Sequence, residues 1–131
     1  VVGLDTFRPV TVENPADHVM HSERYSVSNE TWEACQTAER VVAVGTTTVR
    51  ALESAARGPL TGRTELFLRR GSEFKIVDSM MTNFHMPKST LLMMIDAFIG
   101  ARWKLLYQEA LENQYRFLSF GDAMLLNRMS N

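Results

Sequence analysis

The chain has a single cysteine, Cys35, among its 131 residues. One cysteine cannot form a disulfide within the chain, so a disulfide-stapled secreted scaffold is excluded and a reducing cytoplasm is the expected compartment. Cys35 lies in an amphipathic helical pattern, where a small buried hydrophobe is a better interpretation than a nucleophile.

Long apolar runs are also missing. The longest, Leu91 to Ile95, is interrupted by Asp96 and is far short of the roughly 20 residues that a membrane-spanning helix needs. No signal-peptide pattern opens the chain. We therefore expect no membrane association.

The chain also has no excess of charge of one sign, since its formal net charge is −1. The sequence has no strong electrostatic footprint for nucleic acid, although a local basic patch can be enough. Arg63, Arg69, Arg70 and Lys75 gather around one expected turn. A solvated hairpin explains them better than contact with a phosphate backbone.

What the chain has is an apolar content of 45%, enough for the core of one domain. Strand-like and helix-like stretches alternate, which predicts an α/β fold. The run 41–44 is expected to be buried on both faces of a sheet, and 64–68 with 74–77 to form a hairpin. The expected strands are 1–12, 25–27, 41–44, 64–68, 74–77, 80–84 and 123–126; the expected helices are 29–39, 49–57, 88–99 and 103–115.

The stretch Thr82–Thr90 is the first candidate site, because an extended segment there leads into a helix. Pro87 is suited to a first helical turn, whose free N–H groups would point back at Asn83 and His85. Lys88 adds a cation, and Ser89 and Thr90 add hydroxyls, as in helix starts that bind anions or carboxylates. The alternative is that Ser89 and Thr90 only cap a core helix.

A second candidate is the turn that follows the run 41–44. Gly45 lets the backbone approach a ligand, and Thr46, Thr47 and Thr48 offer hydroxyls at a helix start, with Arg50 one turn later. Ligands of open α/β sheets bind at such turns. The pattern is neither a dinucleotide fingerprint nor a Walker loop, and simple helix capping is the alternative. Glu53 further on is interpreted as a solvated or paired charge.

The third candidate is Asp17-His18-x-x-His21-x-Glu23. Imidazoles and carboxylates this close suit zinc or iron, or a histidine base oriented by Asp17. Ordinary turn chemistry is the alternative.

The fourth candidate is the stretch 115–122, where aromatic rings alternate with Arg116 and Asp122. Stacking surfaces beside a cation can hold an adenine or another base, and Asp122 after Gly121 can accept from ribose hydroxyls. Core packing is the better interpretation of Phe117.

Taken together, these motifs resemble the S-adenosylmethionine:tRNA ribosyltransferase-isomerase family of queuosine biosynthesis. The resemblance rests on 44–55, on Thr82-Asn83-Phe84-His85-x-Pro87-Lys88-Ser89-Thr90, on 115–125 and on 17–23. Asp5, where the family usually has glycine, departs from the pattern. Because the family chain is longer, residues 1–131 are expected to be one fragment of the large α/β domain of a two-domain enzyme, without its upstream part and its inserted small β-barrel domain.

The resemblance implies that the whole enzyme moves and isomerises the ribosyl part of S-adenosylmethionine. The acceptor is 7-aminomethyl-7-deazaguanine in tRNA, and the products are epoxyqueuosine-tRNA, adenine and methionine. It implies no metal and favours a monomeric enzyme. A non-catalytic small-molecule or tRNA-docking module, inactive without the missing region, is the alternative.

Roles follow as hypotheses. His85 is the first candidate for general base, because a helix N-terminus favours neutral imidazole; His18 and His21 are its rivals, with Asp17 as orienter. Substrate contacts are expected from three groups: Thr46, Thr47 and Arg50; Asn83, Phe84, Lys88, Ser89 and Thr90; and Tyr115, Phe120, Gly121 and Asp122.

Overall fold

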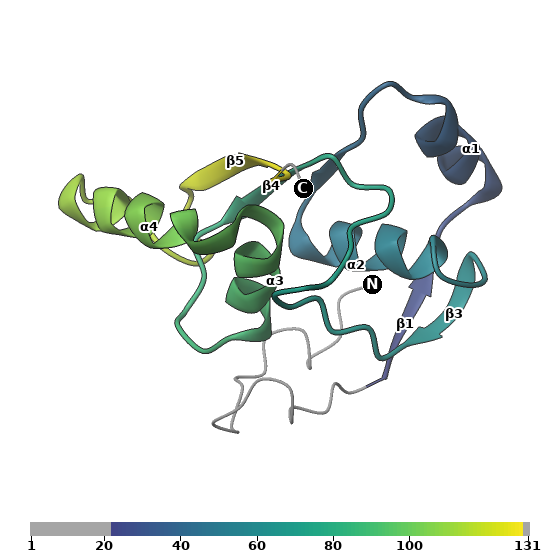
Figure 1. Cartoon of the computed structure of the whole chain (residues 1–131), viewed down its shortest axis with the longest axis horizontal. Coiled ribbons are helices and arrows are strands. Elements are labelled where there is room, and N and C mark those ends of the chain that lie inside the picture. Colours follow the sequence, from purple (N-terminus) through teal and green to yellow (C-terminus); the bar gives the residue numbers. More distant parts are fainter. Residues whose placement is uncertain (1–21, 130–131) are drawn as a thin grey trace.

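The computed structural model describes residues 22–129. The predicted strand 1–12 and the residues Asp17, His18 and His21 lie outside this range. Within it, strands and helices alternate along the chain, which confirms the α/β class (Figure 1). The elements are β1 (Glu23–Ser26), α1 (Asn29–Thr37), β2 (Val42–Val44), α2 (Thr46–Ala55), β3 (Thr61–Thr64), β4 (Ser79–Asn83), α3 (Thr90–Ile99), a 3-10 turn η3 (Gly100–Arg102), α4 (Trp103–Glu112) and β5 (Ala123–Asn127).

The larger sheet has the strand order β2-β4-β5. β2 runs parallel to β4, and β5 runs antiparallel to it. One face of this sheet, with Ala43, Met80 and Leu126, is buried against α2 and α3. Figure 1 shows β4 and β5 lying to one side of α3.

The opposite face of the sheet is open. Val44 pairs with Met81, and Met81 with Leu125, and these three side chains are 64%, 41% and 59% exposed. The prediction that 41–44 is buried on both faces is therefore wrong for the described part of the chain. Its apolar run reflects a strand with helices on one side only.

A second sheet pairs β1 with β3, antiparallel, with Glu23 opposite Thr64. The predicted hairpin of 64–68 with 74–77 is wrong, because Thr64 ends β3 and neither segment is a strand. The physical reason lies in α2. The buried carboxylate of Glu53 accepts the N–H groups of Lys75, Ile76 and Val77 at 2.8–3.0 Å, so these donors are not available to a strand partner.

Two of the helices, α1 and α3, begin at a capping serine, and α3 starts later than predicted. Ser28 caps α1 and Ser89 caps α3, each accepting an N–H from the first turn. Because α3 begins at Thr90, Pro87 lies before the cap and outside the helix. α4 ends at Glu112, before Tyr115. No helix between residues 22 and 129 combines the length and the apolarity that a bilayer crossing requires.

Candidate functional site

One edge of the larger sheet gathers three of the predicted motifs. β2 and β4 run in parallel and end there, and β5, running the other way, begins there. Gly45 donates its N–H to the carbonyl of Met81 at 2.8 Å, and the Asn83 amide donates to the carbonyl of Asp122 at 2.9 Å. The turns after β2 and β4 and before β5 are therefore neighbours, as ligand sites of open α/β sheets require.

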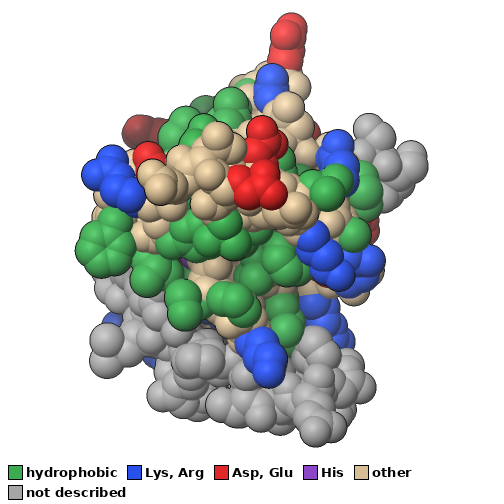
Figure 2. Space-filling view, turned by 90° about the vertical axis from the view of Figure 1, so that its left-hand side faces the viewer, with side chains coloured by type: hydrophobic (Ala, Val, Ile, Leu, Met, Phe, Trp, Pro, Cys, Tyr) green, Lys and Arg blue, Asp and Glu red, His purple; other side chains and the backbone are tan. Residues whose placement is uncertain are grey.

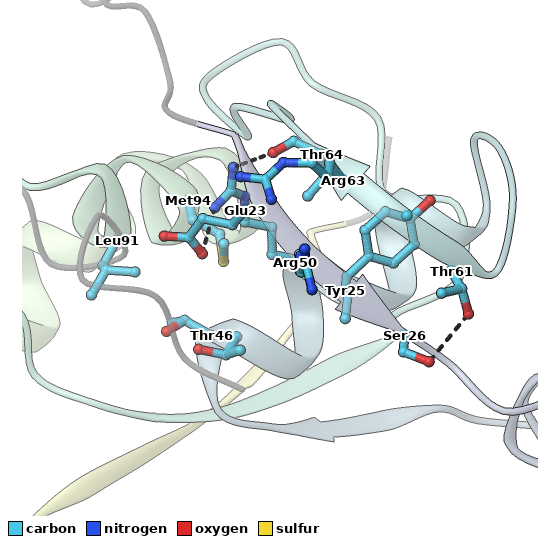
Figure 3. Close-up of a pocket in the computed structure, with 14 residues that line it drawn as sticks. Glu23, Tyr25, Ser26, Thr46, Arg50, Thr61, Arg63, Thr64, Leu91 and Met94 are labelled. Carbon is cyan, nitrogen blue, oxygen red and sulfur yellow. Dashed lines mark hydrogen bonds and ion pairs between the residues drawn. The ribbon is translucent and has the colours of Figure 1, made fainter.

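A cavity of about 560 Å³ lies beside this edge, between β1, β3, α2 and α3 (Figure 3). Thr46, Thr47 and Arg50 line it from α2, and Leu91 and Met94 from α3. Asn83, His85 and Asp122 do not line it. The predicted residues thus divide into a cavity group on α2 and an edge group where β4 ends and β5 begins.

Arg50 is buried and already engaged in the fold. Its guanidinium lies 3.1 Å from the Glu23 carboxylate, and it donates to the carbonyls of Leu66 and Thr64 at 3.0 and 3.3 Å. Figure 3 shows Glu23 and Thr64 on either side of this guanidinium. Arg50 therefore ties the small sheet to α2 and forms one wall of the cavity. Glu23, which the sequence placed in a possible metal cluster, is its ion-pair partner.

His85 is only 8% exposed. Its Nε2 lies 2.7 Å from the Thr82 hydroxyl, and its backbone N–H donates to the Tyr107 hydroxyl at 2.8 Å. Burial lowers the imidazole pKa to about 4 and raises the pKa of Tyr107 to about 12, because desolvation disfavours the charged forms. His85 is neutral at pH 7, as the helix-start argument expected, but the cause is burial.

Thr82 opens the first candidate stretch, but sequence reasoning gave it no role, and it missed Tyr107. Thr82 is three residues before His85 and buried. Because side chains alternate between the two faces of a strand, Thr82 could have been predicted to face inward together with Met80. Tyr107 comes from α4, and nothing in the sequence links it to His85.

The aromatic residues sort into core and surface. Phe84 is buried at the centre of a cluster, with ring centroids 5.0–5.9 Å from Tyr107, Tyr115 and Phe117. Phe117 is packed against the core, as expected. Tyr115 and Phe120 are largely exposed. Of the aromatic residues in the predicted site, Tyr115 and Phe120 therefore offer exposed ring surface for a base.

The remaining predicted residues also take definite places. The Ser89 hydroxyl accepts from the Leu92 N–H at 3.1 Å and donates to the Met86 carbonyl at 2.7 Å. Thr90 is buried and Lys88 is exposed. The Asp122 carboxylate accepts from the backbone and side chain of Arg116, beside Gly121 with φ of +124°. Capping thus explains Ser89, and Lys88 is the exposed cation of this turn.

A family model described as a queuosine biosynthesis protein matches residues 1–126. The chain belongs to this family. It is 51% identical over 136 residues to the S-adenosylmethionine:tRNA ribosyltransferase-isomerase of Polynucleobacter necessarius, with 99% of this chain and 39% of that protein covered. The enzyme of the same name from Thermotoga petrophila is 51% identical, with 95% and 40% covered.

A solved structure of this family agrees with the fold. The crystal structure of S-adenosylmethionine tRNA ribosyltransferase from Thermotoga maritima matches with a TM-score of 0.69 and 49% identity, covering 76% of this chain and 39% of that one. The chain spans about two fifths of the length of the curated relatives it matches.

Metal ligation has no candidate in the described part. Between residues 22 and 129 no group of three or more His, Cys, Asp or Glu side chains is placed to hold an ion. The His18 and His21 pattern lies outside those residues, so the choice between metal ligand and base there stays a prediction.

Proposed function

We propose that this chain is a C-terminal portion of an S-adenosylmethionine:tRNA ribosyltransferase-isomerase. The complete enzyme would transfer and isomerise the ribosyl moiety of S-adenosylmethionine onto 7-aminomethyl-7-deazaguanine in tRNA, releasing adenine and methionine. The observation that carries the proposal is the match to the family over residues 1–126 at about 50% identity to relatives of that name.

The cavity supports a small-molecule substrate. Its volume of about 560 Å³ falls within the roughly 300–1,000 Å³ of ligand pockets. Thr46 and Thr47 stand at the N-terminus of α2, where free N–H groups and the helix dipole favour an anion. We assign this end of the cavity to the methionine carboxylate. Leu91 and Met94 would contact the apolar methylene groups beside the sulfonium.

The neighbouring edge group is assigned to the reacting end of the substrates. Asn83 ends β4, His85 follows two residues later, and Asp122 precedes β5. Tyr115 and Phe120 are open enough to stack on a base. Chemistry of this kind needs the amine, the sulfonium carbon and the leaving adenine held in fixed positions, which supplies much of the rate. A cytoplasmic, monomeric whole enzyme belongs to the same proposal.

A non-catalytic docking module is the second candidate, because the chain spans about two fifths of its relatives. A chimera separates the two: this chain replaces the matching segment of the Polynucleobacter relative, and adenine release is measured with S-adenosylmethionine and precursor tRNA. We expect release from the chimera and none from the 131-residue chain alone. A folded chimera that binds S-adenosylmethionine without releasing adenine would support the docking module.

The cavity assignment has its own matched pair of variants in the chimera. Thr47→Val removes a hydroxyl that lines the cavity, and we expect KM for S-adenosylmethionine to rise about tenfold, since one hydrogen bond to a charged group is worth about 1.5 kcal/mol or more. Thr48→Val makes the same change at the next, exposed residue and should leave KM unchanged. Equal KM values for both variants would remove Thr47 from the binding site.

A further inference from the structure

We propose that Thr82 holds His85 as the Nδ1–H tautomer, so that His85 donates a hydrogen bond to the substrate and does not act as the general base. The inference deepens the proposed function and rests on it for the identity of the substrate. Thr82 is a positioning residue in this scheme, since it acts through His85.

The hydroxyl proton of Thr82 decides the tautomer. Thr82 is buried, and within residues 22–129 its side-chain oxygen has one hydrogen-bond partner, the Nε2 of His85 at 2.7 Å. A buried hydroxyl whose proton has no acceptor destabilises the folded state. Nε2 can accept that proton only when it carries none of its own, so the neutral ring has its proton on Nδ1. The reverse arrangement would leave the hydroxyl proton without an acceptor.

The other ring nitrogen is the one left for a ligand. Within residues 22–129 the side chain of His85 has one hydrogen-bond partner, the Thr82 hydroxyl at Nε2, so Nδ1 is the ring nitrogen that a substrate group can meet. The backbone of His85 is fixed separately by the Tyr107 hydroxyl, which holds the ring position.

The surroundings keep the ring neutral. Burial lowers the pKa of His85 to about 4. Tyr107, the titratable side chain that contacts it from α4, is uncharged at pH 7, and burial raises its pKa further, to about 12. A neutral imidazole N–H stabilises electron density that develops on a ring nitrogen of the departing adenine. As the bond between the ribosyl carbon and the adenine nitrogen breaks, its electron pair stays on the adenine; the imidazole hydrogen-bonds to a ring nitrogen of this anion and keeps its proton, and water protonates the released adenine. The base that deprotonates the carbon beside the sulfonium must then be another group, with His18 and His21 as the candidates.

Nitrogen NMR of the ¹⁵N-histidine-labelled full chain tests the tautomer without substrate. The three histidines are assigned with His18→Gln and His21→Gln, and the measurement is repeated in the chimera. We expect His85 to show a protonated Nδ1 and an unprotonated Nε2 from pH 6 to 8. Thr82→Val should abolish this single tautomer, and Thr82→Ser should restore it. A protonated Nε2, or an imidazolium at pH 7, overturns the proposal.

Adenine release by the chimera tests the role. An asparagine amide reaches the position of Nδ1, and a glutamine amide that of Nε2. We expect His85→Asn to stay within about tenfold of the unsubstituted kcat and His85→Ala to lose about 10²-fold, the loss typical of one donor in an electrostatic site. Thr82→Val should lower kcat about tenfold with KM unchanged, a smaller loss than the roughly 10⁴-fold seen where a triad histidine takes the wrong tautomer, and Thr82→Ser should recover it.

The outcomes separate the two proposals. If His85→Asn is as inactive as His85→Ala, His85 acts as a base and the inference is wrong. If both variants equal the unsubstituted chimera, His85 takes no part in the reaction and the inference is also wrong. A chimera without substitutions that releases no adenine contradicts the proposed function, while the NMR result still decides the tautomer.

Discussion

Glu53 shows at the scale of one residue how a charge organises a loop. Its side chain is fully buried, 2.7 Å from the Arg57 guanidinium, and it accepts three consecutive backbone N–H groups from residues 75–77. A buried carboxylate with these partners is satisfied, whereas its removal leaves three backbone N–H groups unpaired and Arg57 without its counter-charge.

We expect Glu53→Ala to lower the free energy of unfolding by about 3–5 kcal/mol, because it removes the carboxylate partner of Arg57 and leaves the three N–H groups unpaired. Urea unfolding followed by circular dichroism measures the change. Glu65→Ala, at an exposed position, is the control and should stay within about 0.5 kcal/mol. A loss for Glu53→Ala no larger than the control would contradict the assigned role.

His85 predicts a dependence of stability on pH. Its pKa is about 4 in the folded chain, lowered by burial from an ordinary 6.5, so between these values the unfolded chain binds more protons. Stability therefore falls as the pH drops from about 6.5 to about 4, by up to about 3 kcal/mol.

Urea unfolding at pH 7.5 and pH 4.5 measures the loss of stability between these pH values. His85→Asn cannot take up the proton, so its loss should be smaller than that of the unsubstituted chain by up to about 3 kcal/mol. Titration of other groups is common to both proteins and cancels in the comparison. Equal falls in the two proteins would mean that the imidazole is not buried in its neutral form.

At the scale of the element, α3 shows why its start was misjudged. Pro87 suits a first helical turn, but the hydroxyl of Ser89 takes the Leu92 N–H and so sets the N-cap two residues later. Lys88 between them has φ of +59°, a left-handed conformation that no helix continues. The turn that presents Lys88 to solvent is thus distinct from the helix.

We expect Ser89→Ala to destabilise the chain by about 1 kcal/mol through loss of this cap, and Ser89→Asp, which keeps an acceptor oxygen, to recover most of it. Thermal unfolding followed by circular dichroism measures both. If Ser89→Ala and Ser89→Asp lose the same amount, the helix start does not depend on the side-chain acceptor.

At the scale of the whole molecule, apolar surface is the main feature. Besides the open sheet face, Leu105 and Leu111 on α4, and Phe120 before β5, are more than three-fifths exposed. Figure 2, which faces the end of the molecule that carries α4 in Figure 1, shows hydrophobic side chains spread over that surface. Parallel strand pairs such as β2 and β4 are normally covered on both faces.

Two neighbouring residues of β4 test the sidedness of the sheet. Met80→Lys places a charge in the core, where Met80 is fully buried, and should cost more than about 4 kcal/mol or prevent folding. Met81→Lys points to the open face and should change the free energy of unfolding by no more than about 0.5 kcal/mol. Chemical denaturation measures the free energy of unfolding of both variants. Similar losses of stability for Met80→Lys and Met81→Lys would mean that the open face is covered.

The sequence by itself determined the α/β class, most of the helices and strands, and the family, because these depend on local periodicity, capping residues and motifs that are contiguous in the chain. It marked Thr46, Asn83 and Asp122 as candidate site residues, and the strand pairing in the structure brings their turns to one edge of the sheet. Only the tertiary structure decided that Arg50 pairs with Glu23 and that Thr82 and Tyr107 hold His85. It also decided that the N–H groups of residues 75–77 bind the Glu53 carboxylate and do not form the predicted hairpin. Those outcomes depend on burial and on partners 3 to 27 residues away in the chain, and desolvation acts only once the chain has folded.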